Sequence, residues 1–86
     1  MIKVIWKYAV APYFVLDLPE DAEVLTVQLQ NGQPVMWVKL DPQAPCISRP
    51  FVSIATGSSF NDEGAYYIGT FQVEGLVFHV FEVRNG

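Results

Sequence analysis

The stretch Val24–Asp41, VLTVQLQNGQPVMWVKLD, predicts a β-hairpin and sets the fold class of the chain. Asn31-Gly32 is the preferred pair for a two-residue turn in which both residues have positive φ. Such a turn gathers apolar pairs on one face: Leu29/Pro34, Val27/Met36 and Leu25/Val38. The opposite face receives Gln28/Val35, Thr26/Trp37 and Val24/Lys39. Trp37 is therefore a candidate contact residue on a mixed polar and apolar surface.

The rest of the chain follows the same alternation of apolar and polar residues. Val, Ile, Phe, Tyr, Trp and Thr supply 32 of the 86 residues, and alternation fits better than a helical period in every window. We expect further strands at residues 3–10, 13–18, 51–55, 65–73 and 76–83. Residues 41–50 contain three prolines, which predicts a surface loop and excludes a central strand. The expected fold is all-β: a small antiparallel barrel or roll of six to seven strands, with at most one short helical turn near Pro19.

Length and composition limit the classes of function. Eighty-six residues form a single domain over residues 1–86, too small for a two-domain enzyme. A net charge of −4 has the wrong sign for a phosphate backbone or an anionic membrane, so we expect no nucleic-acid and no membrane partner. Cys46 is the only cysteine and His79 the only histidine, which argues against a disulfide and a structural metal site. With no signal sequence recognised, we expect a cytoplasmic protein without a cofactor.

The last quarter of the chain concentrates the excess of apolar residues. AYYIGTFQV and LVFHVFEV flank Glu74-Gly75, which predicts a second tight hairpin. A two-residue turn pairs Phe71 with Phe78 and Thr70 with His79, and it leaves both faces apolar. Only 16% of the chain is charged and 51% is hydrophobic. We therefore expect a homo-oligomer whose interface is this hairpin or an exposed edge strand.

Six residues are candidates for ligand binding, and each has a simpler structural explanation. Aromatic rings suit stacking on a planar ligand, a guanidinium and glycine-rich amides suit an anion, and an imidazole can read a polar edge. The turn at residues 56–59 also needs no ligand to explain it, and a strand histidine is often only half-buried. A nucleophilic pair of Cys46 and His79 lacks an orienting group, so we expect no catalytic residue. The candidates are Trp37, Arg49, Thr56, Gly57, Tyr67 and His79.

A set of short motifs over nearly the whole chain carries a family resemblance. They are Lys7-Tyr8, Trp37 to Asp41, Arg49 with Phe51, Thr56-Gly57, Tyr67 to Thr70, and His79 to Glu82. In this order and spacing the chain resembles a family of short, functionally uncharacterised proteins encoded mainly by bacteriophages.

The resemblance implies an origin and a class of function. Small acidic phage proteins often counteract bacterial defence by binding alone. One expectation is a non-enzymatic protein in the host cytoplasm that sequesters a nucleotide signal in an oligomeric pocket. Arg49, Thr56 and Gly57 would then hold a phosphate, while Trp37 or Tyr67 stacks on the base and His79 or Thr70 reads its edge. The alternatives are an acidic inhibitor that blocks a nucleic-acid-binding groove of a defence protein, and a structural or virion-associated module.

Overall fold

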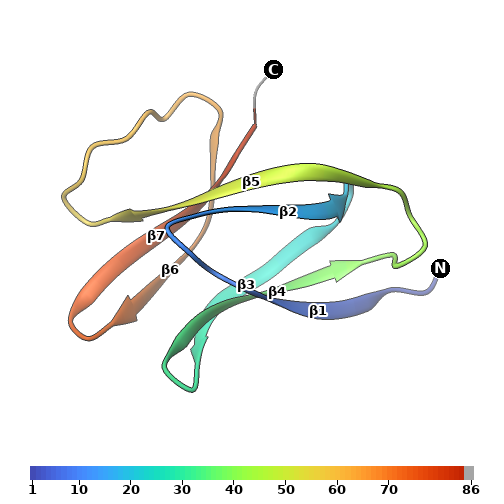
Figure 1. The fold of residues 1–86 in the computed structure, drawn as a ribbon, viewed down its shortest axis with the longest axis horizontal. Helices are drawn as coiled ribbons and strands as arrows, with labels where there is room; N and C mark the ends of the chain where they lie inside the picture. The colour runs from blue at the N-terminus through green and yellow to red at the C-terminus, as the bar shows by residue number, and fades with distance from the viewer. Residues whose placement is uncertain (85–86) are drawn as a thin grey trace.

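The computed structural model describes residues 1–84, which form seven strands and no helix (Figure 1). One antiparallel sheet has three strands in the order β1-β4-β3 and the other has four in the order β2-β5-β7-β6. The all-β prediction is confirmed. The strands are β1 (Val4–Ala9), β2 (Tyr13–Pro19), β3 (Glu23–Gln30), β4 (Gln33–Leu40), β5 (Cys46–Ala55), β6 (Ala65–Val73) and β7 (Leu76–Val83).

The hairpin of β3 and β4 turns at Asn31-Gly32, as predicted, with φ angles of 52° and 77°. The predicted register is confirmed from Gln30/Gln33 to Thr26/Trp37. Beyond this point it is wrong, because the register shifts between Val24 and Thr26 and Val24 lies opposite Val38. The shift leaves Leu25 exposed as the extra residue of a β-bulge.

The hairpin of β6 and β7 turns at Glu74-Gly75, where both residues have positive φ. Phe71/Phe78 and Thr70/His79 are paired as predicted. A second register shift, between Tyr67 and Gly69, pairs Tyr67 with Phe81 and not with Glu82. The bulge therefore moves Tyr67 to the face that carries His79.

The predicted loop at residues 41–50 is too long, because β5 already begins at Cys46. β5 is also a central strand, between β2 and β7. Pro50 is tolerated because β7 joins β5 only from Phe51 onward, so β2 alone borders the strand at the proline. The segment Pro19–Ala22 forms a plain turn closed by a hydrogen bond from Ala22 N to Pro19 O (3.1 Å).

The core lies between the two sheets. The three-stranded sheet and the turn before it contribute Ala22, Val27, Met36, Val38 and Leu40, and the four-stranded sheet contributes Leu18, Phe51, Phe71 and Val80. The edge strands β3 and β6 approach closely where Gly69 faces Val27. The alternation of apolar and polar residues in residues 3–10 predicts Trp6 in the core, but Trp6 is half exposed, because it lies on the edge strand β1.

Candidate functional site

The outer face of the four-stranded sheet is the most distinctive exposed surface of the chain. Because side chains alternate along a strand, Phe51, Phe71 and Val80 point into the core and the residues between them point outward. One row of paired residues crosses all four strands: Tyr13, Val52, Phe81 and Tyr67. We call this surface the aromatic face. It consists of Tyr13, Val15, Val52, Ile54, Thr56, Phe60, Tyr67, Thr70, Gln72, Val77, His79 and Phe81.

Three aromatic rings lie in contact at one end of the aromatic face. Phe81 on β7 is flanked by Phe60, at a centroid distance of 5.0 Å, and by Tyr67, at 5.7 Å. Phe60 comes from the loop between β5 and β6, so this loop folds back onto the sheet. The rings remain accessible, because Phe60 is 45% and Tyr67 is 61% exposed. Exposed aromatic rings on a rigid sheet are typical of contact surfaces.

A row of hydrogen-bonded side chains runs beside these rings. The Tyr67 hydroxyl lies 2.6 Å from Thr70 Oγ1, which lies 3.0 Å from Nδ1 of His79. On the other side of the imidazole, Nε2 lies 2.8 Å from Thr56 Oγ1, whose hydroxyl also reaches the Val77 carbonyl at 3.3 Å. Three of the predicted site residues, Thr56, Tyr67 and His79, therefore meet in one polar row, with Thr70 as the link between two of them.

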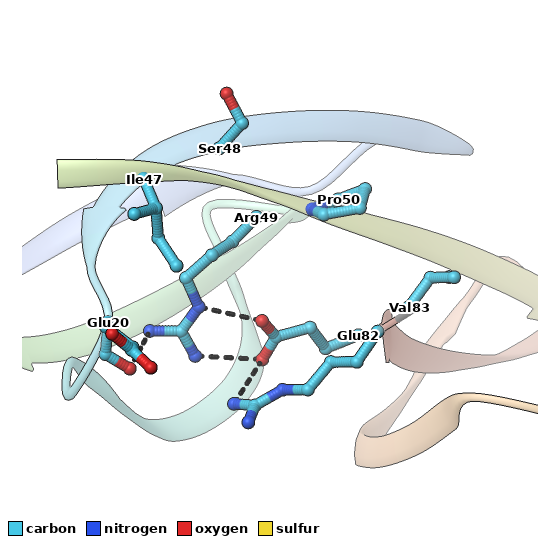
Figure 2. A pocket seen from close by; sticks show the side chains of 8 residues that line it. Glu20, Ile47, Ser48, Arg49, Pro50, Glu82 and Val83 are labelled. Atoms are coloured by element: carbon cyan, nitrogen blue, oxygen red, sulfur yellow. Dashed lines mark hydrogen bonds and ion pairs between the residues drawn. The ribbon is translucent and has the colours of Figure 1, made fainter. Parts of the chain in front are cut away.

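Arg49 lies apart from this row, inside the protein (Figure 2). Its Nε and Nη2 atoms donate to the two carboxylate oxygens of Glu82 at 2.7 and 2.8 Å. Its Nη1 atom donates to the carbonyls of Pro19 and Ala22, both at 2.9 Å, and more weakly to that of Glu20. With 4% exposure and its donors engaged, Arg49 holds the turn before β3 against β5 and β7. We therefore leave it out of the candidate site.

The ion pair determines the charge state of Glu82. Burial alone would raise the pKa of this carboxyl, but the hydrogen bonds and charge of Arg49 favour the ionised form more strongly, and Arg84 adds to them at 3.4 Å. The net effect lowers the pKa of Glu82 below its ordinary value. Glu82 is thus a buried carboxylate that stays charged and is only 4% exposed.

The remaining predicted residues do not complete a phosphate site. Gly57 adjoins Thr56 in a turn with φ of 93°, but the Thr56 amide donates to Val77 O and the Ser58 amide to Ala55 O. Trp37 lies on the outer face of the other sheet, opposite Lys7 on β1 and Thr26 on β3. The structure therefore places Trp37 on a different surface from His79.

The aromatic face carries no lysine or arginine. The five basic residues of the sequence all lie within the described residues 1–84, and each has a partner elsewhere. By contrast, Asp62 and Glu63 follow Phe60 closely in its loop, and Glu74 forms the hairpin turn. The basic residues pair as Lys3 with Asp21, Lys7 with Gln30, Lys39 with Glu23, and both Arg49 and Arg84 with Glu82.

Within residues 1–84, no group of three or more His, Cys, Asp or Glu side chains has a geometry that could hold a metal ion. The same residues contain no helix that is long and apolar enough to cross a membrane.

Sequence reasoning missed the parts of the site that depend on tertiary contacts. Phe60 lies in a loop, and nothing in its neighbourhood predicts that its ring packs against Phe81. Phe81 itself had a signal, because it follows His79 by two residues and so shares its face of the strand. The place of Tyr67 depends on the bulge after it, which the sequence pattern does not predict.

One comparison places the chain in a family. Searches of curated proteins and of solved structures gave no match. A family model described as a domain of unknown function (DUF7352) matches residues 1–86. This match spans both hairpins, the buried ion pair and the aromatic face, so the chain belongs to the DUF7352 family.

Proposed function

We propose that this chain is a binding protein without catalytic activity, and that its aromatic face covers an apolar, basic-rimmed surface of another protein. The observation that carries the proposal is the composition of this face. The exposed rings of Phe60 and Tyr67 lie on a face without lysine or arginine, and Asp62 and Glu63 follow Phe60 within three residues of its loop. A complementary partner surface is therefore apolar at its centre and positively charged at its rim.

The polar row supports binding over catalysis. Thr56 and His79 have the spacing of a nucleophile and a base at 2.8 Å. The other imidazole nitrogen, however, faces the hydroxyl of Thr70 and not a carboxylate. A hydroxyl supplies no negative charge to stabilise an imidazolium, which is the task of the third member of a catalytic triad.

The fold gives this face a rigid support. We treat the two sheets as one small, partly open barrel or roll, because β3 approaches β6 at Val27 and Gly69 and β1 leads directly into β2. The core then fixes the inner side of the four-stranded sheet, and its outer side remains free for a partner.

The resemblance to phage-encoded proteins supports a class of partner. In this proposal the chain acts in the bacterial host cytoplasm, and its target is a defence protein with a basic nucleic-acid-binding groove. The net charge of −4 fits such a groove. A second copy of the chain fits the face less well, because both copies carry a net charge of −4 and repel each other.

A nucleotide is the second candidate ligand. The hydroxyl and imidazole groups of Thr70 and His79 favour it, since they can hydrogen-bond to the edge of a base. The buried position of Arg49 counts against it, because the phosphate would find no cation on this face. A panel of cyclic nucleotides that leaves the melting temperature unchanged would remove this candidate.

Affinity capture from a bacterial lysate, followed by reconstitution with the purified partner, tests the proposal. The wild type is compared with Tyr67→Lys, which reverses the charge preference of the aromatic face, and with Ile5→Lys, a control on the exposed outer face of the other sheet. We expect one partner that the wild type and Ile5→Lys retain and Tyr67→Lys loses. Its affinity should fall as salt rises from about 50 to about 500 mM. Equal binding by the three chains, or binding that rises with salt, contradicts the proposal.

A further inference from the structure

The polar row on the aromatic face allows two directions for its hydrogens. Thr56 has one hydroxyl hydrogen and two neighbouring acceptors, the carbonyl of Val77 at 3.3 Å and Nε2 of His79 at 2.8 Å. If the hydroxyl donates to Val77, Nε2 must carry a hydrogen and donate to Thr56. If the hydroxyl donates to Nε2 of His79 instead, Thr56 Oγ1 and the carbonyl oxygen of Val77 face each other without a hydrogen between them. Counted within the protein, the first direction makes four hydrogen bonds along the row and the second makes three.

The first direction fixes the rest of the row. With its hydrogen on Nε2, neutral His79 has a bare Nδ1 that accepts from the Thr70 hydroxyl at 3.0 Å. The Thr70 oxygen then accepts from the Tyr67 hydroxyl at 2.6 Å. The hydrogen of Tyr67 thus points inward, and the phenolic oxygen presents only lone pairs to the solvent.

We infer that His79 is held as the Nε2–H tautomer, and that it is a positioning residue that makes the Tyr67 hydroxyl an acceptor for a lysine or arginine side chain of the partner. This inference rests on the proposed function, which requires a basic partner. Ammonium and guanidinium groups carry donors only, so they match an outward lone pair.

The tautomer can be read on the isolated chain by long-range proton–nitrogen NMR in the pH range where the imidazole is neutral. His79 is the only histidine, so its two ring nitrogens need no further assignment. We expect Nε2 to be protonated and Nδ1 to be bare in nearly all molecules. A protonated Nδ1, or the averaged mixture of a free imidazole, overturns the inference.

Two variants separate the parts of the row. Thr56→Val keeps the shape of the side chain but removes the acceptor for Nε2–H, so we expect it to abolish the tautomer preference. Tyr67→Phe removes the phenolic oxygen and leaves Thr70 in place, so the preference should persist. A preference that survives in Thr56→Val overturns the inference.

The purified partner provides the second readout. We expect Tyr67→Phe to weaken its binding on the order of tenfold, because a partner cation loses one charge-assisted hydrogen bond. Gln28→Ala, on the other sheet, should leave the affinity unchanged. Unchanged binding in Tyr67→Phe overturns the acceptor role. Because the tautomer is measured without a partner, a failure to capture any partner contradicts the proposed function alone.

Discussion

Arg49 and Glu82, 33 residues apart in the sequence, form a two-pronged ion pair at 2.7 and 2.8 Å inside the protein. The same guanidinium holds the carbonyls of the turn between β2 and β3. One side chain therefore connects two strands of the four-stranded sheet with the segment that leads into the other sheet. Residues 1–84 contain no buried side-chain nitrogen or oxygen without a hydrogen-bond partner.

Replacement of Arg49 should strongly destabilise the fold. Arg49→Met leaves the buried Glu82 carboxylate with only the longer contact to Arg84 at 3.4 Å, and we expect a loss of about 3–5 kcal/mol in the free energy of unfolding. The double variant Arg49→Met/Glu82→Leu should recover part of this loss. Only part is regained, because the carbonyls of Pro19 and Ala22 still lack their donor.

Lys39→Met provides the matched control in urea denaturation. Lys39 pairs with Glu23 at 3.3 Å on the surface, so we expect a change of less than about 1 kcal/mol. A similar loss in Lys39→Met and Arg49→Met would show that burial gives the Arg49 pair no special role.

The stability should fall in acid through Glu82. Its pKa is lower in the folded chain than the ordinary value of 4.5, so the folded state favours the ionised form. This contribution is fully present above the pKa of the unfolded chain and is lost as the pH falls through the folded pKa. The difference in unfolding free energy between wild type and Glu82→Gln should therefore shrink from about pH 5 to about pH 2. A constant difference over this range argues against the ion pair as its source.

The sequence predicted local structure more accurately than tertiary structure. The turn at Asn31-Gly32 follows from two residues that tolerate positive φ, and the turn at Glu74-Gly75 follows from its glycine between two apolar runs, although glutamate adopts positive φ less readily than Asn or Asp. The bulges after Val24 and Tyr67 do not follow, because an extra residue disturbs the register without changing the composition of the strand. The prolines before Phe51 predicted a loop where β5 in fact begins. A strand tolerates them there because β7 joins β5 only from Phe51 onward, and the sequence does not show where two distant strands meet.

The candidate site was predicted only where it depends on local structure. The pairing of Thr70 with His79 follows from the turn, so their proximity was predictable. Arg49 next to a serine- and glycine-rich loop suggested an anion site, because its partner Glu82 lies on a distant strand that composition does not place. A buried charge pair is visible only in three dimensions.

Gly69 should be sensitive to any side chain. A Cβ atom there would lie 3.3 Å from the Cβ and Cγ2 atoms of Val27, where β6 meets β3. We expect Gly69→Ala to lower the free energy of unfolding by about 1–3 kcal/mol through overpacking. In Gly69→Ala/Val27→Ala the two changes should be less than additive, because Val27→Ala removes the Cγ2 atom, one of the two atoms that the new methyl group meets at 3.3 Å. Strict additivity in a thermal-denaturation cycle would contradict this close approach.

Photo-crosslinking in bacteria tests the central claim, that the aromatic face is the binding surface, most directly. A benzoylphenylalanine is placed at Gln72, on the aromatic face of β6, or at Gln28, on the outer face of β3. Both glutamines are exposed strand residues, Gln72 two positions before the Glu74-Gly75 turn and Gln28 three positions before the Asn31-Gly32 turn. We expect a single adduct with another protein from position 72 and none from position 28. An adduct from position 28 alone, an adduct of two copies of this chain, or no adduct from position 72 contradicts it.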